Sequence, residues 1–163
     1  MKVIGIDPGL ASTGVGMVRG IKFRIEAFSY CDINTSKDLQ IQNRLKIIYS
    51  KISTIIEEQV PDLIVVEDIF SISKFPKSSI TLGKVCGVIL LACGNSNIPV
   101  KEIQVREAKK VLTGNGSANK KQLERAVRHV LKYNNTIKPH HASDALALAL
   151  IGFYRSIPMN NFN

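Results

Sequence analysis

Apolar residues follow two different spacings along the chain, which predict strands first and helices later. Residues 3–6 form a short apolar run that predicts a buried strand, and segment 13–18 predicts its returning partner. A third strand is expected over residues 23–31. Residues 62–67 are nearly all apolar, which is typical of a strand buried on both faces.

Helical spacing begins after the third strand. The apolar residues of segment 45–55 recur every three or four positions and predict a helix that Ser36 caps and Pro61 ends. A second helix should end at Gly94, and residues 99–103 read as a short strand. A helix, a glycine loop and two more helices follow. This order indicates an α/β protein with a mixed five-stranded sheet flanked by helices, compatible with a ribonuclease-H-like fold.

Length and composition bound the class of protein. With 163 residues and 45% apolar content, we expect one domain over residues 1–157 and a short disordered tail over 158–163. No apolar run approaches the ~20 residues of a membrane span, and the sequence starts with a strand rather than a signal peptide. Cys86 and Cys93 form no CxxC pair and are expected in the core. These features favour a cytoplasmic protein.

Charge is distributed unevenly between the two parts of the chain. Residues 1–70 carry 8 Lys and Arg against 9 Asp and Glu, whereas residues 71–163 carry 14 against 4. Such asymmetry within one domain suggests a polyanionic partner. The alternative is a basic surface that serves solubility alone.

Asp7 is the first candidate for chemistry, because it ends an apolar strand inside a glycine-rich hairpin. Acids are depleted in strands, and a buried charge needs a partner or a metal. Gly14 and Gly16 let another group approach closely. The alternative is an acid that only caps the Asp-Pro-Gly turn.

Glu67 ends its apolar strand in the same way as Asp7. Neighbouring side chains on a strand point to opposite faces, so Glu67 and Asp68 cannot both face one site. If the two strands are adjacent, Asp7 and Glu67 meet at one edge of the sheet. A strand-end charge without a function is the alternative for Glu67.

The third element is segment 139–151, in which apolar residues all round predict a helix buried against the sheet. His141 and Asp144 lie three apart on one face near its N-terminal end. The alternatives are an acid stabilised by the helix dipole and, for His140 and His141, a solvated helix start.

Three separate segments thus supply ligand-type groups at the ends of elements. Oxygen-rich clusters bind hard cations such as Mg²⁺ or Mn²⁺. Two such ions stabilise both the attacking and the leaving oxygen in phosphodiester hydrolysis. The combination is more specific than any single member.

Four motifs in this order carry a resemblance to a known family. They are GIDPGLASTGVG near the start, EDIF at 67–70, GNGSANK at 114–120 and HASDALA at 141–147. The chain resembles the RuvC family of Holliday-junction resolvases over nearly its whole length. The resemblance implies a homodimer that cuts four-way DNA junctions symmetrically in recombination and repair. It also implies two Mg²⁺ ions per site, with Mn²⁺ able to substitute, and association with the RuvA–RuvB branch-migration complex.

By resemblance, four residues carry over as catalytic and metal-binding: Asp7, Glu67, His141 and Asp144. The family has Asp or His at the position of His141. A neutral imidazole there removes one negative charge and suits Mn²⁺ better than Mg²⁺. His141 either ligates a metal or helps to activate the attacking water. Ser143 stands where alanine is expected, which changes little. With these partners for Asp7, we interpret the glycines around it, Gly14 and Gly16, as space for a metal and a DNA backbone.

The resemblance also implies residues that contact DNA near the cut. They are Lys120 and an upstream lysine, Lys109, with Lys121 and Lys110 as close alternatives. Phe70 lies in a loop with basic residues and would stack on an unpaired base. The alternative for Phe70 is a place in the core.

Two predicted helices carry features of an interface. Segment 120–132 has a basic side whose phosphate contacts would make binding salt-dependent. Segment 78–94 carries Gly83 and Gly87 four apart, so it either packs closely on the sheet or pairs two copies about a two-fold axis. The basic side consists of Lys120, Lys121, Arg125, Arg128 and Lys132.

Three other classes of protein share parts of the pattern. Ribonuclease-H-like enzymes that act on RNA share the GxDxG start but explain neither Phe70 nor the basic half. ATP-binding domains of the actin or sugar-kinase type need a second domain, for which the chain is too short. A DNA-binding module without catalysis would not require the intact acidic set. The 114–120 loop lacks the spacing and preceding strand of a P-loop.

Overall fold

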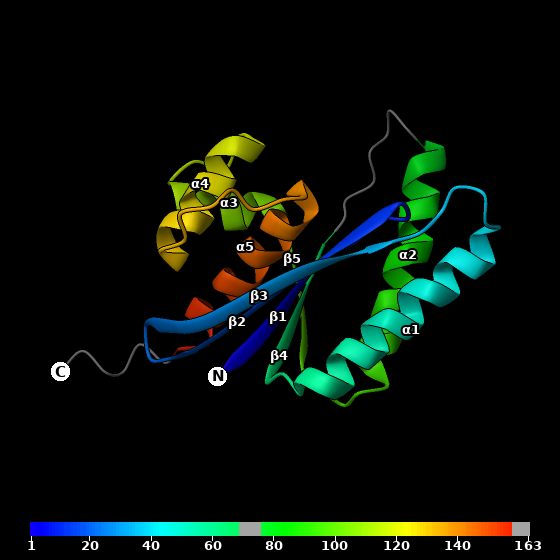
Figure 1. The fold of residues 1–163 in the computed structure, drawn as a ribbon, viewed down its shortest axis with the longest axis horizontal. Coiled ribbons are helices and arrows are strands. Elements are labelled where there is room, and N and C mark those ends of the chain that lie inside the picture. The colour runs from blue at the N-terminus through cyan, green and yellow to red at the C-terminus, as the bar shows by residue number, and fades with distance from the viewer. Residues whose placement is uncertain (69–75, 158–163) are drawn as a thin grey trace.

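The structure is a computed structural model that describes residues 1–68 and 76–157. Phe70 and the expected tail lie outside the described residues. The elements follow in the predicted order (Figure 1): β1 (Lys2–Asp7), β2 (Ser12–Ile21), β3 (Arg24–Asn34), α1 (Ile41–Gln59), β4 (Leu63–Glu67), α2 (Pro76–Gly94), β5 (Val100–Ile103), α3 (Val105–Thr113), α4 (Lys120–Leu131) and α5 (His140–Arg155).

The five strands form one mixed sheet, as predicted, in the order β3-β2-β1-β4-β5. β1 and β2 are antiparallel, as are β2 and β3, whereas β4 is parallel to both β1 and β5. Ile6 of β1 pairs with Val66 of β4. The two strands therefore run side by side and end at the same edge of the sheet.

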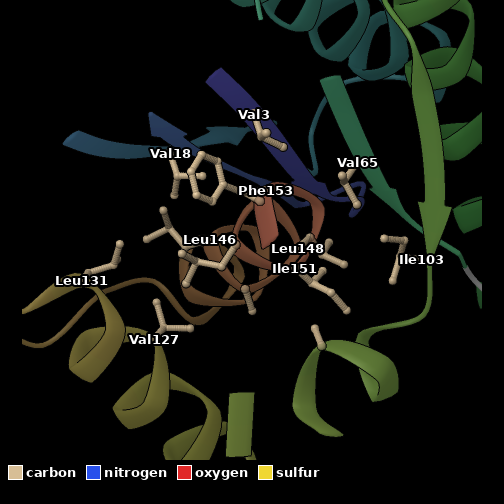
Figure 2. Close-up of a cluster of buried hydrophobic side chains, with 14 of the residues drawn as sticks. Val3, Val18, Val65, Ile103, Val127, Leu131, Leu146, Leu148, Ile151 and Phe153 are labelled. Atoms are coloured by element: carbon tan, nitrogen blue, oxygen red, sulfur yellow. The ribbon is translucent and has the colours of Figure 1, made fainter. Parts of the chain in front are cut away.

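Helices cover both faces of the sheet, with α1 and α2 on one face and α3, α4 and α5 on the other (Figure 1). Alternation along β1 divides its side chains between two cores. Ile4 and Ile6 pack with α1 and α2, whereas Val3 packs with α5. Figure 2 shows Val3, Val18 and Val65 meeting the side chains of α5. Residues in phase with Val3 along β1 therefore face α5.

The glycines of the first hairpin make room for α5. A Cβ atom on Gly14 would overlap the carbonyl oxygen of His141, and one on Gly16 would lie 2.5 Å from the backbone nitrogen of Leu146. The expectation that these glycines leave space for a metal and DNA is wrong. Glycine signals a close approach, and here the approaching group is a helix backbone.

The predicted cap of α1 is also wrong. The helix begins at Ile41, with Gln40 at the N-cap position and no side-chain capping hydrogen bond. The hydroxyl of Ser36 instead accepts a hydrogen bond from the backbone N–H of Asp38. This local turn uses the side chain that was expected to cap the helix.

Helix α2 has one core face and one outward face. Val85, Ile89 and Cys93 pack in the core between α2, α1 and the sheet, whereas Cys86 is only partly buried. Gly83 and Gly87 face outward, and an added Cβ on either would meet no atom within 4 Å. The alternative in which these glycines pack on the sheet is therefore wrong.

Helix α2 carries apolar residues on its outward face as well as on its core face, so the helix is apolar on average. Within the described chain, Lys77–Gly94 is the one helical segment that passes for a membrane span by length and composition, with a mean hydropathy of 1.4. Helices of soluble proteins pass the same test, and the inner face of α2 belongs to a core. The segment therefore does not indicate a membrane protein.

Candidate active site

Asp7 and His141 form the centre of the site. Asp7 ends β1 in phase with Val3, so its side chain points toward α5, where His141 is the second residue. Nδ1 of His141 lies 2.6 Å from Oδ2 of Asp7. Asp7 is buried, whereas the imidazole is 39% exposed. This bond with Asp7 raises the pKa of His141, against the opposing effect of burial.

Asp7 does not cap the hairpin turn. The hydroxyl of Thr13 donates to the carbonyl oxygen of Gly9 at 2.8 Å and so fastens the turn itself. The carboxylate of Asp7 contacts a helix 134 residues away. The turn-cap alternative is therefore wrong.

Glu67 lies beside Asp7 at the same sheet edge. Leu63 and Val65 belong to the core on the α5 side, so Glu67, in phase with them, faces that side and Asp68 does not. Burial, a side-chain hydrogen bond with Asp7 and the charges of Asp7 and Asp144 raise the pKa of Glu67 to about 9. At neutral pH the structure thus favours a protonated Glu67 bound to Asp7.

Asp144 completes the acidic group from the second turn of α5. It is buried, and its pKa is raised, mainly by desolvation and to a lesser extent by the charge of Asp7. The helix dipole acts most strongly on an acid within the first turn of a helix. Helix α5 begins at His140, so Asp144 lies beyond that turn. The three carboxylates and His141 therefore lie at one place, where β1 and β4 end against α5.

Two lysines act on this acidic group. The charge of Lys109 lowers the pKa of Glu67 and of Asp144, and the charge of Lys120 lowers that of Asp144. Lys109 is partly buried on α3, and Lys120 begins α4. Lys121 is exposed next to Lys120. The cations act on the site from the two helices that the sequence motifs indicated.

The donor set fits a hard divalent cation in its chemistry. Carboxylate oxygens with one imidazole nitrogen suit Mg²⁺ or Mn²⁺. Within residues 1–68 and 76–157, however, no three His, Cys, Asp or Glu side chains are preassembled around one point. Asp7 instead shares hydrogen bonds with His141 and Glu67. Binding a cation therefore requires these side chains to turn toward it.

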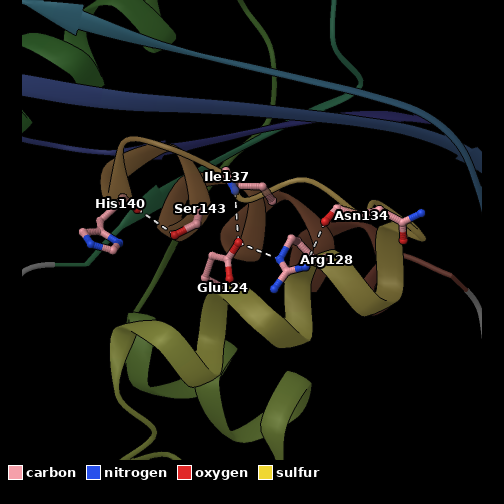
Figure 3. Close-up of polar contacts among 6 residues, drawn as sticks. All are labelled: Glu124, Arg128, Asn134, Ile137, His140 and Ser143. Carbon is pink, nitrogen blue, oxygen red and sulfur yellow. Dashed lines mark hydrogen bonds and ion pairs between the residues drawn. The ribbon is translucent and has the colours of Figure 1, made fainter.

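One residue with a structural role near the site was not predicted. Glu124 is buried on α4 and accepts hydrogen bonds from Arg128 and from the backbone N–H of Ile137, in the loop that leads into α5 (Figure 3). The i,i+4 spacing of Glu124 and Arg128 was the available signal, but the same spacing is usual on exposed helices. Its burial distinguishes this pair.

Comparison with known proteins identifies the family. Residues 3–152 match the family model described as crossover junction endodeoxyribonuclease RuvC. The chain is 38% identical over 155 residues to the crossover junction endodeoxyribonuclease RuvC of Carboxydothermus hydrogenoformans, and the match covers 95% of this chain and 97% of the relative.

Solved structures agree with this match. Thermus thermophilus RuvC in complex with a Holliday junction substrate has a TM-score of 0.85 at 26% identity, over 95% of this chain and 94% of that chain. The yeast mitochondrial Holliday junction resolvase Ydc2 shares the fold, with a TM-score of 0.62 at 14% identity, over 94% of this chain and 77% of its own. The predicted ribonuclease-H-like fold is confirmed. The chain belongs to the RuvC family of crossover junction endodeoxyribonucleases.

Proposed function

We propose that this chain resolves four-way DNA junctions by hydrolysing phosphodiester bonds at the group formed by Asp7, Glu67, His141 and Asp144. The observation that carries the proposal is the meeting of these residues, from three distant segments, at one end of the sheet. Family membership supplies the substrate class, because its relatives are named crossover junction endodeoxyribonucleases. Lysines beside the acids support a phosphate ligand.

The three carboxylates would hold the divalent cations, of which we propose two per site, Mg²⁺ or Mn²⁺. Cations bound there supply positive charge that lowers the pKa of water and stabilises the leaving oxygen. Asp7 orients the ring of His141 through Nδ1, which leaves Nε2 for a proton of the attacking water or for a cation. Because the hydrogen bond with Asp7 raises its pKa, His141 binds a proton more readily than a free imidazole, as a group that takes a proton from water must.

Lys109, Lys120 and Lys121 would hold the DNA backbone near the cleaved bond. The first two already compensate the acids, so a phosphate that approaches them gains attraction close to the reacting position. Stacking of Phe70 on an unpaired base stays a prediction. Association with RuvA–RuvB also stays a prediction, which a pull-down with the purified partners would test.

A direct assay tests the proposed function. The protein is incubated with a mobile four-way junction, a linear duplex and a structured RNA, each with Mg²⁺, Mn²⁺ or EDTA. We expect paired nicks in the junction alone, with either metal and not with EDTA. Cleavage of RNA alone, or undiminished cleavage by Asp7→Asn, would refute the proposal.

We further propose that two copies pair through the outward face of α2. Ile80 and Leu91 are 63% and 57% exposed, and with Gly83 and Gly87 they follow helical spacing along one side. Apolar side chains flanking glycines allow two helices to approach closely. A two-fold pair would match the symmetry of a junction cut on two strands.

Sedimentation velocity tests the pairing. Leu91→Asp places a charge on the proposed interface and is expected to yield monomers at concentrations where the parent chain is dimeric. Val111→Asp is the matched control, because Val111 is 52% exposed on α3. Equal sedimentation of the Leu91 variant and the control would exclude this interface.

A further inference from the structure

A basic surface hollow lies at the C-terminal end of α4, away from the acidic group. Its volume is about 430 Å³. Six residues line it: Arg125, Arg128, His129, Lys132, Tyr133 and Asn134. We call it the α4 hollow.

The α4 hollow carries uncompensated positive charge. Arg125 and Lys132 are exposed, and neither forms an ion pair within the described residues. Glu124, the acid on the same helix, is buried and already bound by Arg128 and the N–H of Ile137. The hollow therefore attracts anions.

Contacts with neighbouring residues and with one another fix the side chains that line the hollow. Figure 3 shows Arg128 held between Glu124, at 2.7 Å, and the carbonyl oxygen of Asn134, at 3.4 Å. The ring of Tyr133 meets that of Phe28 on β3 edge-on, with centroids 5.3 Å apart. Such preorganisation reduces the conformational entropy that binding removes.

The hollow continues a line of cations that starts at the site. At 100° per residue, Lys121, which neighbours Lys120, and Arg125 lie about 40° apart around α4, and Lys132 is the C-cap residue that follows the helix. At 1.5 Å per residue, Lys132 lies about 17 Å along the helix axis from Lys121. Lys120 is close enough to the acids to lower the pKa of Asp144. This length corresponds to about five base pairs of duplex, at about 3.4 Å each.

We propose that the α4 hollow binds the phosphate backbone of a duplex arm, about two to five base pairs from the cleaved bond. The inference rests on the proposed function, because it takes the DNA cut at the acidic group as the DNA that reaches the hollow. A duplex arm is favoured over an acidic protein, since the cations run on from those beside the site. Arg125 and Lys132 supply the phosphate contacts, and Arg128 shapes the hollow.

Salt-dependent binding of a four-way junction in EDTA gives the first test. Arg125→Gln with Lys132→Gln removes two contacts, which should lower the slope of log affinity against log salt by about 1.8. Between 50 and 200 mM salt the parent chain should therefore lose about twelvefold more affinity than this double variant. The matched control is Lys46→Gln with Lys51→Gln, which removes two exposed charges from α1 on the opposite face. The salt slope of the control should lie within about half a unit of the parent slope.

Uncharged phosphate analogues show where along the duplex arm the hollow binds. Methylphosphonates at the second and fifth phosphates from the cleaved bond should weaken DNA binding by the parent chain and by the control, and should leave DNA binding by the double variant unchanged. A double variant with the parent slope would overturn the inference. So would methylphosphonates that weaken the double variant as much as the parent, which is the result expected if the hollow serves an acidic protein.

Cleavage of the unmodified junction separates this inference from the proposed function. If methylphosphonates weaken binding by the parent chain but not by the double variant, we call the two changes coupled. Coupling without any cleavage would refute the proposed function and leave the hollow as a DNA site. Cleavage without that coupling would refute the hollow alone. Absence of junction binding by the parent chain would refute both.

Discussion

Oδ2 of Asp7 lies 2.6 Å from Nδ1 of His141, and the same carboxylate accepts a hydrogen bond from Glu67. One buried acid thus connects the first strand, the fourth strand and the last helix. Because Asp7 holds both neighbours, changes at this residue should alter the chemistry of the whole group.

Asp7→Asn should reduce junction cleavage by about 100-fold or more while junction binding persists, because even the loss of a partner that orients a metal ligand costs about 10–100-fold in activity, and Asp7 is proposed as a ligand itself. It should also lower the pKa of Glu67 from about 9, since one charge that raises it is gone. Gel assays of nicking and a carboxyl NMR titration measure the two effects. An unchanged Glu67 titration would contradict the proposed contact.

The metal-free protein should become less stable as pH rises between about 5 and about 9. Glu67 titrates near 9 in the folded chain and near 4.5 when unfolded, so over this range the folded state holds a proton that the unfolded state has released. The pKa of His141 is raised in the folded chain as well. The stability that protonated His141 contributes is likewise lost as pH rises through its pKa in the folded state.

Thermal unfolding in EDTA across this pH range measures the trend. Glu67→Gln should make the midpoint depend less on pH, since an amide has no proton to lose. An equal pH dependence in the parent chain and the Glu67 variant would contradict the burial of Glu67 against Asp7.

His141→Asp should shift the metal preference toward Mg²⁺. The change adds a carboxylate beside Asp7 and removes the imidazole nitrogen, and hard oxygen donors favour Mg²⁺ over softer ions. We expect the ratio of Mn²⁺-supported to Mg²⁺-supported cleavage rates to fall several-fold. An unchanged ratio, with cleavage retained, would show that His141 acts on the water rather than on the cation.

Gly14→Ala should destabilise the fold and reduce cleavage together. The new methyl group would overlap the carbonyl oxygen of His141, so α5 must move at the residue that faces Asp7. Overpacking of this kind costs about 1–3 kcal/mol. Urea unfolding and the nicking assay measure the two effects.

Gly94→Ala is the control for this change, because a Cβ there meets no atom within 4 Å. It should leave the free energy of unfolding within about 1 kcal/mol of the parent. Equal stability of the two alanine variants would show that the hairpin moves to accommodate the methyl group, and that α5 does not pack tightly against Gly14.

The acidic group was predictable because each member carries a local signal. Asp7 and Glu67 end apolar strands, and the pleat decides which of Glu67 and Asp68 faces the site. Their meeting depended only on β1 and β4 being neighbours, which they are. His141 and Asp144 follow from helical spacing in a segment that is apolar all round.

The parts that could not be predicted depend on contacts between distant segments. Gly14 signals a close approach but cannot name the approaching backbone, which proved to be that of α5. Glu124 and Arg128 have the spacing of an ordinary surface pair, and burial beneath the 132–139 loop is a property of the tertiary fold. Gly83 likewise says nothing of which side of α2 meets the sheet.

The seating of α5 on the glycine hairpin has a consequence during synthesis. At about 5–20 residues per second, a ribosome needs roughly 7–27 s to pass from Asp7 to His141. During that time the growing chain contains Asp7, and later Glu67, but no helix to complete their site. A nascent chain that stalls before residue 141 therefore lacks two of the four residues proposed for the site.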